Sequence, residues 1–251
     1  MQKIKLCELF GPTVEGEGLY IGNPFIVIRT SGCNLKCDYC DTKFSSWWSS
    51  DEKEYSIEEI LDYIHKNACK NISITGGEPL YRSEEELASL LELCKRLQEE
   101  KYFIKFETNA TIFRPEFLPY VDFWSLSPKL KGMGDNTYFN KEVVSMYLLD
   151  PIRSQLKFVV GARKENNTME EDLQAIRKLI EGEPLVRARN LPVVLQPEGL
   201  TENIREYLDR SQLLVERVVN CNKIDWDFWE TINLLILPQW HRLLWNNARR
   251  K

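Results

Sequence analysis

The sequence predicts an α/β protein built around a parallel β-sheet, arranged either as a barrel or as an open sheet covered by helices. Short apolar segments rich in Ile, Val and Phe alternate along the chain with longer segments of helical periodicity. The apolar segments carry few charges, as strands buried on both faces do. Because strands and helices alternate, neighbouring strands are expected to run parallel. The 251 residues suit one large domain or two small ones.

The apolar segments place the strands, and the periodic segments place the helices. The predicted strands are Phe25–Thr30, Ile72–Thr75, Phe103–Glu107, Val121–Leu126, Gln155–Val160 and Pro192–Gln196. The predicted helices are Ser56–Lys66, Ser83–Glu100, Lys141–Leu149 and Thr168–Ile180. Three of these helices begin with Ser or Thr followed three residues later by Glu, which is the pattern of a capping box. The pairs are Ser56 with Glu59, Ser83 with Glu86 and Thr168 with Glu171.

Polar and glycine-rich motifs follow most of the predicted strands directly. In chain order they are GCNLKCDYC after the first strand, TGGEP (75–79), ETNAT (107–111), SPK (127–129) and QPEG (196–199). The carboxyl ends of parallel strands in a barrel form one face, and that face carries the active site. We therefore expect these motifs to meet at one site.

The composition excludes several classes of function. Lys and Arg number 33 against 38 Asp and Glu, so the formal net charge is −5, which disfavours general binding to nucleic-acid phosphates. The N-terminal MQKIKLCELF lacks the apolar core and cleavage site of a signal peptide. No segment approaches the roughly 20 apolar residues of a membrane span. We expect a cytoplasmic protein that binds neither membrane nor nucleic acid.

Three of the seven cysteines, Cys33, Cys37 and Cys40, form the pattern C-x3-C-x2-C. In a reducing cytosol, so tight a cluster indicates a metal site rather than a disulfide. The remaining cysteines are scattered and are interpreted as ordinary thiols; they are Cys7, Cys69, Cys94 and Cys221.

Three interpretations of the cluster compete. The thiols could share one face of a helix, although Gly32, Asn34 and Asp38 favour a loop. They could hold a structural zinc ion, but a fourth ligand at suitable spacing is missing. They could hold a 4Fe–4S cluster and leave one iron open to another ligand.

The C-x3-C-x2-C spacing resembles that of the radical S-adenosylmethionine superfamily. In that superfamily S-adenosylmethionine chelates the open iron, and the reduced cluster cleaves it to a radical that abstracts hydrogen. The motif TGGEP strengthens the resemblance, because GGEP-type motifs line the methionine amino group there. The resemblance implies a 4Fe–4S cluster on the three cysteines and S-adenosylmethionine as cofactors.

Within this superfamily the chain resembles the 7-carboxy-7-deazaguanine synthase family over nearly its whole length. The matching segments are FGPTVEGEG (10–18), Arg29, GCNLKCDYCDT, ITGGEP, ETN, SPK, LKFVV and LPQWHRLLW (237–245). The resemblance implies a single domain over residues 1–251 with a partial, abbreviated βα barrel. In it, residues 10–18 form a substrate-binding turn and residues 237–251 close the site.

The resemblance also implies an activity and partners. The family converts 6-carboxy-5,6,7,8-tetrahydropterin to 7-carboxy-7-deazaguanine by hydrogen abstraction and ring contraction with loss of ammonia, in the synthesis of deazapurines such as queuosine. A homodimer and an electron donor such as flavodoxin are expected. Two other functions stay open. One is a glycyl-radical activating enzyme, which would have no reason to carry the pterin-contact residues. The other is a non-catalytic zinc-binding module, which would contain zinc without iron or sulfide.

Substrate-binding positions are carried over residue by residue. Arg29, in an apolar strand, matches the residue that grips the substrate carboxylate, although it could instead pair with an acidic side chain. Glu15 departs from the family, in which many members carry Gln; an ionised Glu accepts hydrogen bonds but cannot donate them. The full set implied is Val14, Glu15, Gly16, Glu17, Arg29, Thr75 and His241.

Metal and cofactor positions follow in the same way. Thr42 matches the residue whose hydroxyl ligates Mg²⁺, with a helix N-cap as the alternative. The positions implied for S-adenosylmethionine are Tyr39, Cys40, Asp41, Gly77, Ser127, Pro128, Lys129, Gln196, Pro197, Glu198 and Gly199.

Overall fold

The computed structural model describes residues 3–47, 52–134, 139–149, 153–162, 167–246 and 248–249. Within them, one sheet has the strand order β3-β1-β2-β4-β5-β6-β7-β8-β9. The strands are β1 (Lys3–Val14), β2 (Pro24–Thr30), β3 (Lys53–Ser56), β4 (Asn71–Gly76), β5 (Phe103–Thr108), β6 (Phe123–Leu126), β7 (Ser154–Val160), β8 (Pro192–Pro197) and β9 (Asn233–Ile236).

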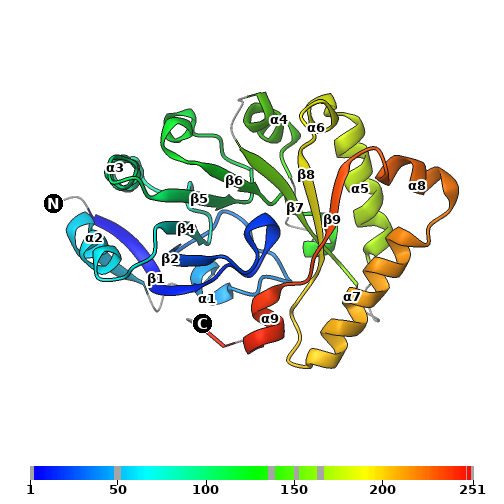
Figure 1. Cartoon of the computed structure of the whole chain (residues 1–251), viewed down its shortest axis with the longest axis horizontal. Helices are drawn as coiled ribbons and strands as arrows, with labels where there is room; N and C mark the ends of the chain where they lie inside the picture. The colour runs from blue at the N-terminus through cyan, green and yellow to red at the C-terminus, as the bar shows by residue number, and fades with distance from the viewer. Residues whose placement is uncertain are drawn as a thin grey trace.

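From β2 to β9 every neighbouring pair of strands is parallel, whereas β1 pairs antiparallel with both β2 and β3. Strands β3 and β9 form the two edges and do not pair with each other. The sheet is curved but open, and helices cover its outer side (Figure 1). The predicted partial βα barrel is therefore confirmed.

The helices follow the strands along the chain. They are α1 (Lys43–Ser46), α2 (Ile57–His65), α3 (Glu84–Glu99), α4 (Lys141–Leu149), α5 (Met169–Glu181), α6 (Pro184–Ala188), α7 (Ile204–Val219), α8 (Lys223–Trp229) and α9 (Trp240–Trp245). Short 3-10 turns lie at η1 (Gly18–Tyr20), η3 (Pro115–Tyr120) and η4 (Lys131–Met133). Figure 1 shows α2, α3, α4, α6, α5 and α7 around the outside, with α9 and the C-terminus near β1.

The core lies between the sheet and its outer helices. Ile72 and Ile74 of β4 are fully buried in one apolar cluster with Leu90 and Leu97 of α3. Each such side chain contributes about 1.5–3 kcal/mol through burial. This layer fixes the positions of the strands, and therefore the positions of the loops at their carboxyl ends.

Two of the three expected helix caps form. Ser56 and Glu59 make a full capping box at α2, and the Ser83 side chain accepts from the Glu86 backbone at α3. The capping box predicted at Thr168 is wrong: its hydroxyl donates instead to Asp172 one turn into α5, at 3.0 Å. Asp172 also accepts from the backbone of Gly161, so α5 is fastened to the end of β7 by this carboxylate.

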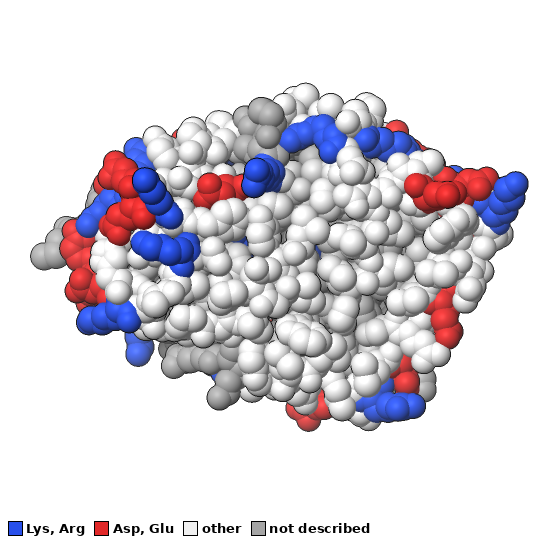
Figure 2. Space-filling view, viewed as in Figure 1, with Lys and Arg blue, Asp and Glu red and all other residues white. Residues whose placement is uncertain are grey.

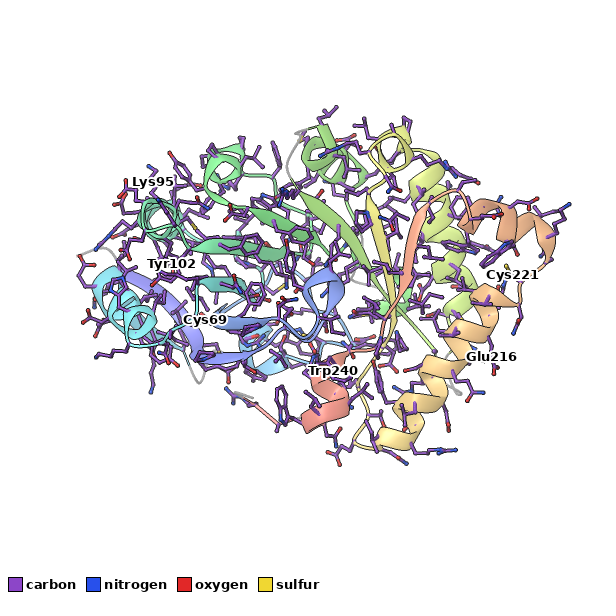
Figure 3. All side chains as sticks on the ribbon, viewed as in Figure 1. Cys69, Lys95, Tyr102, Glu216, Cys221 and Trp240 are labelled. Carbon is purple, nitrogen blue, oxygen red and sulfur yellow. The ribbon has the colours of Figure 1, made fainter. Side chains whose placement is uncertain are left out.

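No helix in the described part of the chain is both long and apolar enough to cross a lipid bilayer. On the face seen in Figure 2, Lys, Arg, Asp and Glu gather at the periphery and the centre carries few charges. That face therefore offers no broad basic patch for a nucleic acid. The scattered cysteines lie apart, with Cys69 and Cys221 on opposite sides of the molecule (Figure 3).

Candidate active site

A cavity of about 410 Å³ opens at the carboxyl ends of the parallel strands; we call it the central cavity. The sequence-predicted residues in its wall are Val14, Glu15, Gly16, Glu17, Arg29, Cys33, Cys37, Tyr39, Cys40, Asp41, Thr42, Thr75, Gly77, Ser127, Lys129, Gly199 and His241. Four others, Pro128, Gln196, Pro197 and Glu198, are not part of that wall. The structure thus brings most of the predicted positions to one place.

The three clustered cysteines lie in an irregular loop between β2 and α1. Backbone bonds fasten this loop, from Gly32 N–H to Ser45 O at 2.6 Å and from Asp38 N–H to Met133 O at 2.7 Å. Residues 32–42, all of which the structure describes, contain no helix. The interpretation of the cysteines as one face of a helix is therefore wrong.

The arrangement of the thiols fits an iron–sulfur cluster better than a single ion. All three are free, and their sulfur atoms do not all lie within 4.8 Å of one another. Ligands of one zinc ion, with Zn–S bonds of roughly 2.3 Å, would lie within roughly 4 Å of one another. A cube of four irons holds its thiolates further apart. Leu35, Tyr39 and Met133 surround the thiols with an apolar wall.

Burial controls the protonation of these thiols before any metal binds. It raises the pKa of Cys33 to about 11 and also raises the pKa of Cys37. Only thiolates ligate iron, so loading the site releases protons.

The glycines of TGGEP allow a close approach between two loops. A Cβ on Gly77 would lie 1.9 Å from the carbonyl oxygen of Gly32, so no larger residue fits beside the cysteine loop. The next residue, Glu78, is fully buried and accepts from Thr108 Oγ1 at 2.8 Å and from Asn109 N–H at 2.7 Å. Glu78 therefore joins the loop after β4 to the ETN segment at the end of β5.

A chain of alternating charges forms the floor of the central cavity; we call it the charge ladder. It runs Glu15–Lys105–Glu107–Lys157–Glu17, through ion pairs between successive members. Both lysine side chains are only 1% exposed. Lys105 and Glu107 lie two residues apart on β5 and so share one face, and Lys157 reaches them from β7.

The ladder favours the ionised forms of Glu17 and Lys157. Burial opposes the ionisation of Glu17, but Lys157 and His241 outweigh it and hold the pKa of Glu17 well below its usual range. Burial likewise disfavours the Lys157 ammonium, yet Glu107 and Glu17 raise the pKa of Lys157 above its usual value. Three carboxylates against two ammonium groups leave a net charge of 2 − 3 = −1. The floor therefore offers fixed acceptors to a ligand rich in N–H groups.

Arg29 lies beside Thr75, its partner on the parallel strand β4. Its Nε donates to Glu8 Oε2 at 2.9 Å, so the alternative that Arg29 pairs with an acidic residue is realised at one nitrogen. No other acceptor for Arg29 is present among the described residues. The two Nη atoms are therefore available to a carboxylate in the cavity.

Thr42 precedes α1 at its N-cap position. Its side chain makes no capping bond, and its hydroxyl lies 3.7 Å from the sulfur of Cys40. The hydroxyl is consequently not engaged as a helix cap, and beside the cysteine loop it is placed as a hard oxygen donor for a cation.

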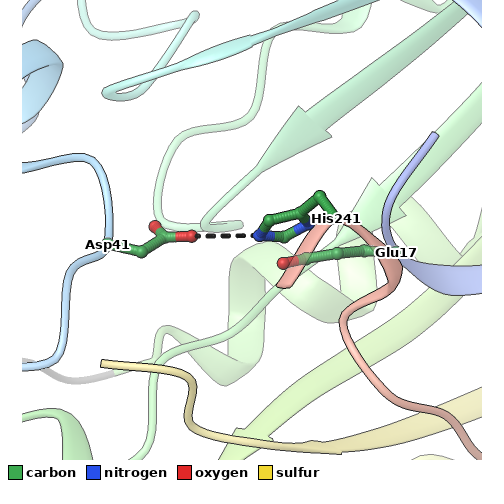
Figure 4. Close-up of side chains that lie close together, drawn as sticks. All are labelled: Glu17, Asp41 and His241. Carbon is green, nitrogen blue, oxygen red and sulfur yellow. Dashed lines mark ion pairs between the residues drawn. The ribbon is translucent and has the colours of Figure 1, made fainter. Parts of the chain in front are cut away.

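The C-terminal helix α9 packs against the substrate-binding turn. Trp240 N–H donates to Gly16 O at 2.7 Å, and a Cβ on Gly16 would lie 2.3 Å from His241 Nδ1. Ligand atoms of Glu17, Asp41 and His241 all lie within 4.8 Å of one another (Figure 4). His241 Nε2 is 4.0 Å from Asp41 Oδ2. Residues 247, 250 and 251 of the predicted closing segment lie outside the described residues.

Comparison with known proteins places this site in a family. The model of the Radical SAM superfamily matches residues 27–123. A 7-carboxy-7-deazaguanine synthase of Halobacterium salinarum is 32% identical over 217 residues, which cover 79% of this chain and 78% of that protein. The chain belongs to the 7-carboxy-7-deazaguanine synthase family. A synthase of Pyrobaculum aerophilum is 28% identical over 253 residues, covering 99% of this chain and 98% of that one.

Solved structures show the same fold. The crystal structure of QueE from Escherichia coli has a TM-score of 0.63 at 22% identity, covering 94% of both chains. The structure of anSMEcpe with bound AdoMet has a TM-score of 0.52 at 14% identity, covering 82% of this chain and 59% of that one. Membership of the Radical SAM superfamily implies a 4Fe–4S cluster and S-adenosylmethionine as cofactors. The cysteine loop described above fits the first of these.

In this family member, the positions assigned to S-adenosylmethionine divide into two groups. Lys129 Nζ donates to Ser127 Oγ at 2.9 Å, and both side chains reach the central cavity. Glu198 is instead buried in an ion pair with Arg210, so its carboxylate serves the packing of α7 on β8. Gly199 reaches the cavity, where Gln239 approaches so closely that a Cβ would lie 1.9 Å from its Oε1.

Sequence reasoning missed several residues of the site. They are Glu8, Lys105, Lys157, Gln239 and Arg249. The sequence did single out Lys105 and Lys157, because each is the only charged residue in a short apolar segment, FIKF for Lys105 and LKFV for Lys157. A buried lysine is expected to have a carboxylate partner. Gln239 donates to Glu17 Oε1 at 2.7 Å, a contact across 222 residues that no local pattern indicates.

Proposed function

We propose that this enzyme converts 6-carboxy-5,6,7,8-tetrahydropterin to 7-carboxy-7-deazaguanine by hydrogen abstraction and ring contraction with loss of ammonia. The product and ammonia together contain all atoms of the pterin, so the overall reaction needs no net oxidant. The supporting observation is that one cavity is lined by the three thiols, Arg29, Thr42 and every member of the charge ladder except Lys105.

The ends of the charge ladder suit the ring of this substrate. Glu15 and Glu17 are acceptors whose positions are fixed by Lys105 and Lys157. A reduced pterin presents an amino group and ring N–H groups along its edge, and ionised carboxylates accept from such donors. The fixed geometry orients one ring C–H toward the cysteine loop, and positioning of this kind is a large part of catalysis.

The other end of the cavity suits the substrate carboxylate. The two Nη atoms of Arg29 donate to the two oxygens of the substrate carboxylate. Thr42 provides a hard oxygen ligand for Mg²⁺, and the substrate provides further oxygen ligands for the ion. When bound, the cluster and S-adenosylmethionine supply the radical that abstracts hydrogen. Leu35, Tyr39 and Met133 exclude water from the place where it acts.

Several further features belong to this proposal. The product enters deazapurine synthesis of the queuosine type. The enzyme acts in the cytoplasm as a homodimer. An electron donor such as flavodoxin reduces the enzyme. The chain forms a single domain over residues 1–251, in which the turn at 10–18 binds the substrate and the segment 237–251 closes the site. The contact between Trp240 and Gly16 supports that closure.

Turnover by the anaerobically reconstituted enzyme tests the proposed reaction. The assay contains dithionite, S-adenosylmethionine, Mg²⁺ and 6-carboxytetrahydropterin, and products are identified by mass spectrometry. We expect a product lighter than the substrate by one ammonia. Formation of 5′-deoxyadenosine without loss of ammonia from the pterin would refute the proposed substrate. A glycyl-radical signal on a partner protein would favour the activating-enzyme alternative.

A further inference from the structure

The side chain of Asn109, directly after β5, donates to one of the three clustered cysteines. Its Nδ2 group donates to Cys33 Sγ at 3.8 Å. The same group carries a second hydrogen, which donates to Asn34 Oδ1 at 3.0 Å. Asn109 is only 5% exposed and lines the central cavity together with Cys33. Both hydrogens of this amide are therefore used within the site.

The orientation of the amide follows from the turn after β5. Asn109 Oδ1 accepts from the backbone N–H of Thr111 at 3.0 Å and from the Thr111 hydroxyl at 2.6 Å. A backbone N–H can only donate, so the carbonyl oxygen of the amide faces Thr111 and the Nδ2 group faces Cys33. Ala110, between them, has a φ of 55°, a left-handed conformation that is uncommon for alanine. The turn thus directs the donor at the sulfur.

Further bonds hold the amide in this position. Thr111 Oγ1 accepts from Asn34 Nδ2 at 2.8 Å, so Asn34, Thr111 and Asn109 form a closed ring of hydrogen bonds. The backbone N–H of Asn109 donates to the buried carboxylate of Glu78 at 2.7 Å. The donor is therefore fixed by the loop after β4 as well as by the cysteine loop. A fixed donor needs no reorganisation when charge develops on its acceptor.

Iron binding changes what Cys33 does in this network. The protonated thiol can donate to Asn34 Oδ1, which lies 4.0 Å away, but an iron-bound thiolate has no proton and can only accept. Its sulfur accepts from the backbone N–H of Leu35 at 3.4 Å and from Asn109 Nδ2. When the cluster takes up one electron from a reductant, its negative charge increases. A donor to a ligand sulfur then stabilises the reduced cluster more than the oxidised one.

We propose that Asn109 is a positioning residue that raises the reduction potential of the 4Fe–4S cluster through its hydrogen bond to Cys33. A higher potential allows a given electron donor to reduce a larger share of the enzyme. Asn109 is not among the residues that the sequence predicted for cofactor binding, and it acts on the cluster through a ligand rather than as one. The inference rests on the assignment of the cluster to the cysteine loop and not on the identity of the substrate.

A redox titration of the anaerobically reconstituted enzyme tests this role. The titration uses dithionite with redox mediators, contains neither S-adenosylmethionine nor pterin, and follows the electron paramagnetic resonance signal of the reduced cluster. Iron and sulfide contents are measured for every variant. In Asn109→Ala the equilibrium constant for reduction should fall about tenfold, which for one electron is a downward shift of about 59 mV in the midpoint potential. Asn109→Asp keeps the size of the side chain and should fall at least as far, because an oxygen that only accepts replaces the donor.

Thr111→Val is the matched control for this titration. It removes the hydroxyl that bonds to Asn34 and to Asn109, and so opens the same ring of hydrogen bonds. It keeps the backbone N–H of residue 111, which orients the amide toward Cys33. We therefore expect the midpoint potential of Thr111→Val to equal that of the native enzyme.

The possible outcomes separate tuning of the cluster from support of the loop. A native potential in both Asn109 variants would overturn the inference, because the donor would then have no effect on the cluster. An equal shift in Thr111→Val would also contradict it, since a loosened turn would explain the change. If neither Asn109 variant retains iron and sulfide, Asn109 serves cluster assembly and the inference is wrong. Turnover of 6-carboxytetrahydropterin is measured separately, so a failure of the proposed substrate leaves the shift in potential unaffected.

Discussion

Lys105 and Lys157 are charged side chains buried in otherwise apolar strands, and each has carboxylates on two sides. A buried charge is costly when unpaired, so members of the charge ladder depend on one another. Their contribution to function is rigidity, because the ion pairs hold Glu15 and Glu17 in fixed directions in the cavity.

Replacing Lys105 tests this dependence. Lys105→Met leaves Glu15 buried beside no cation, and we expect the free energy of unfolding to fall by about 3 kcal/mol. The double variant Glu15→Gln/Lys105→Met should lose less, because the uncompensated charge is gone. Urea denaturation measures both. Lys178→Met, at an exposed position on α5, is the control and should change stability by no more than about 0.5 kcal/mol. Equal losses in the single and double variants would contradict the coupling.

Cys37 distinguishes a cluster site from an ordinary thiol. Cys37→Ala should abolish iron and sulfide incorporation and all formation of 5′-deoxyadenosine, because the cluster loses one of three protein ligands. Cys221→Ala, on the far side of the fold, should retain both. Metal analysis and product assays after anaerobic reconstitution make the comparison. Full cluster content in Cys37→Ala would exclude the assigned ligand set.

Thr42 is the proposed protein ligand of Mg²⁺. Thr42→Ala should leave the iron content unchanged and remove most of the response of turnover to added Mg²⁺, because the hydroxyl is lost together with only one methyl group. Thr42→Ser keeps the hydroxyl and should keep the response. Initial rates over a Mg²⁺ titration test this, and an unaltered response in Thr42→Ala would refute the role.

At the scale of elements, the cavity depends on contact between the turn after β1 and helix α9. Gly16→Ala would drive a methyl group into the His241 ring, whose Nδ1 lies 2.3 Å from that position. We expect α9 to shift and the KM for the pterin to rise about tenfold, since small displacements of positioning groups are costly. Gly182→Ala is the control, because its added Cβ would crowd only the flexible end of Lys141 and make an ordinary contact with Lys178 O at 3.4 Å. Steady-state kinetics that show the same KM for Gly16→Ala and the native enzyme would argue against this contact as a determinant of binding.

For the whole molecule, the parallel half of the sheet was predictable and the N-terminal part was not. Apolar runs mark β2 and β4 to β8, and the rule that parallel strands end on one face brought their motifs together. The two short edge strands, β3 and the parallel β9, were not predicted. Strand β1 gives no such signal, since its burial alternates irregularly and it contains Gly11 and Pro12. Its antiparallel pairing with β2 places Glu8 beside Arg29, a contact that depends on register alone.

The charge ladder was unpredictable for a related reason. Glu15 and Lys105 are 90 residues apart, and Glu17 and Lys157 are 140 apart. The members of each pair lie on separate elements, so only the folded sheet brings them together. A local pattern can show that a lysine is flanked by apolar residues, but only the fold can supply its partner.

The central claim is that one cavity brings the pterin within reach of the radical generated at the cysteine loop. The most direct measurement is a single turnover with 6-carboxytetrahydropterin deuterated at its reduced ring carbons, followed by mass spectrometry of 5′-deoxyadenosine. We predict deuterium in the 5′-deoxyadenosine, because the abstracted atom comes from the pterin. 5′-Deoxyadenosine formed at the same rate without deuterium would show that the pterin does not lie in this cavity as the substrate.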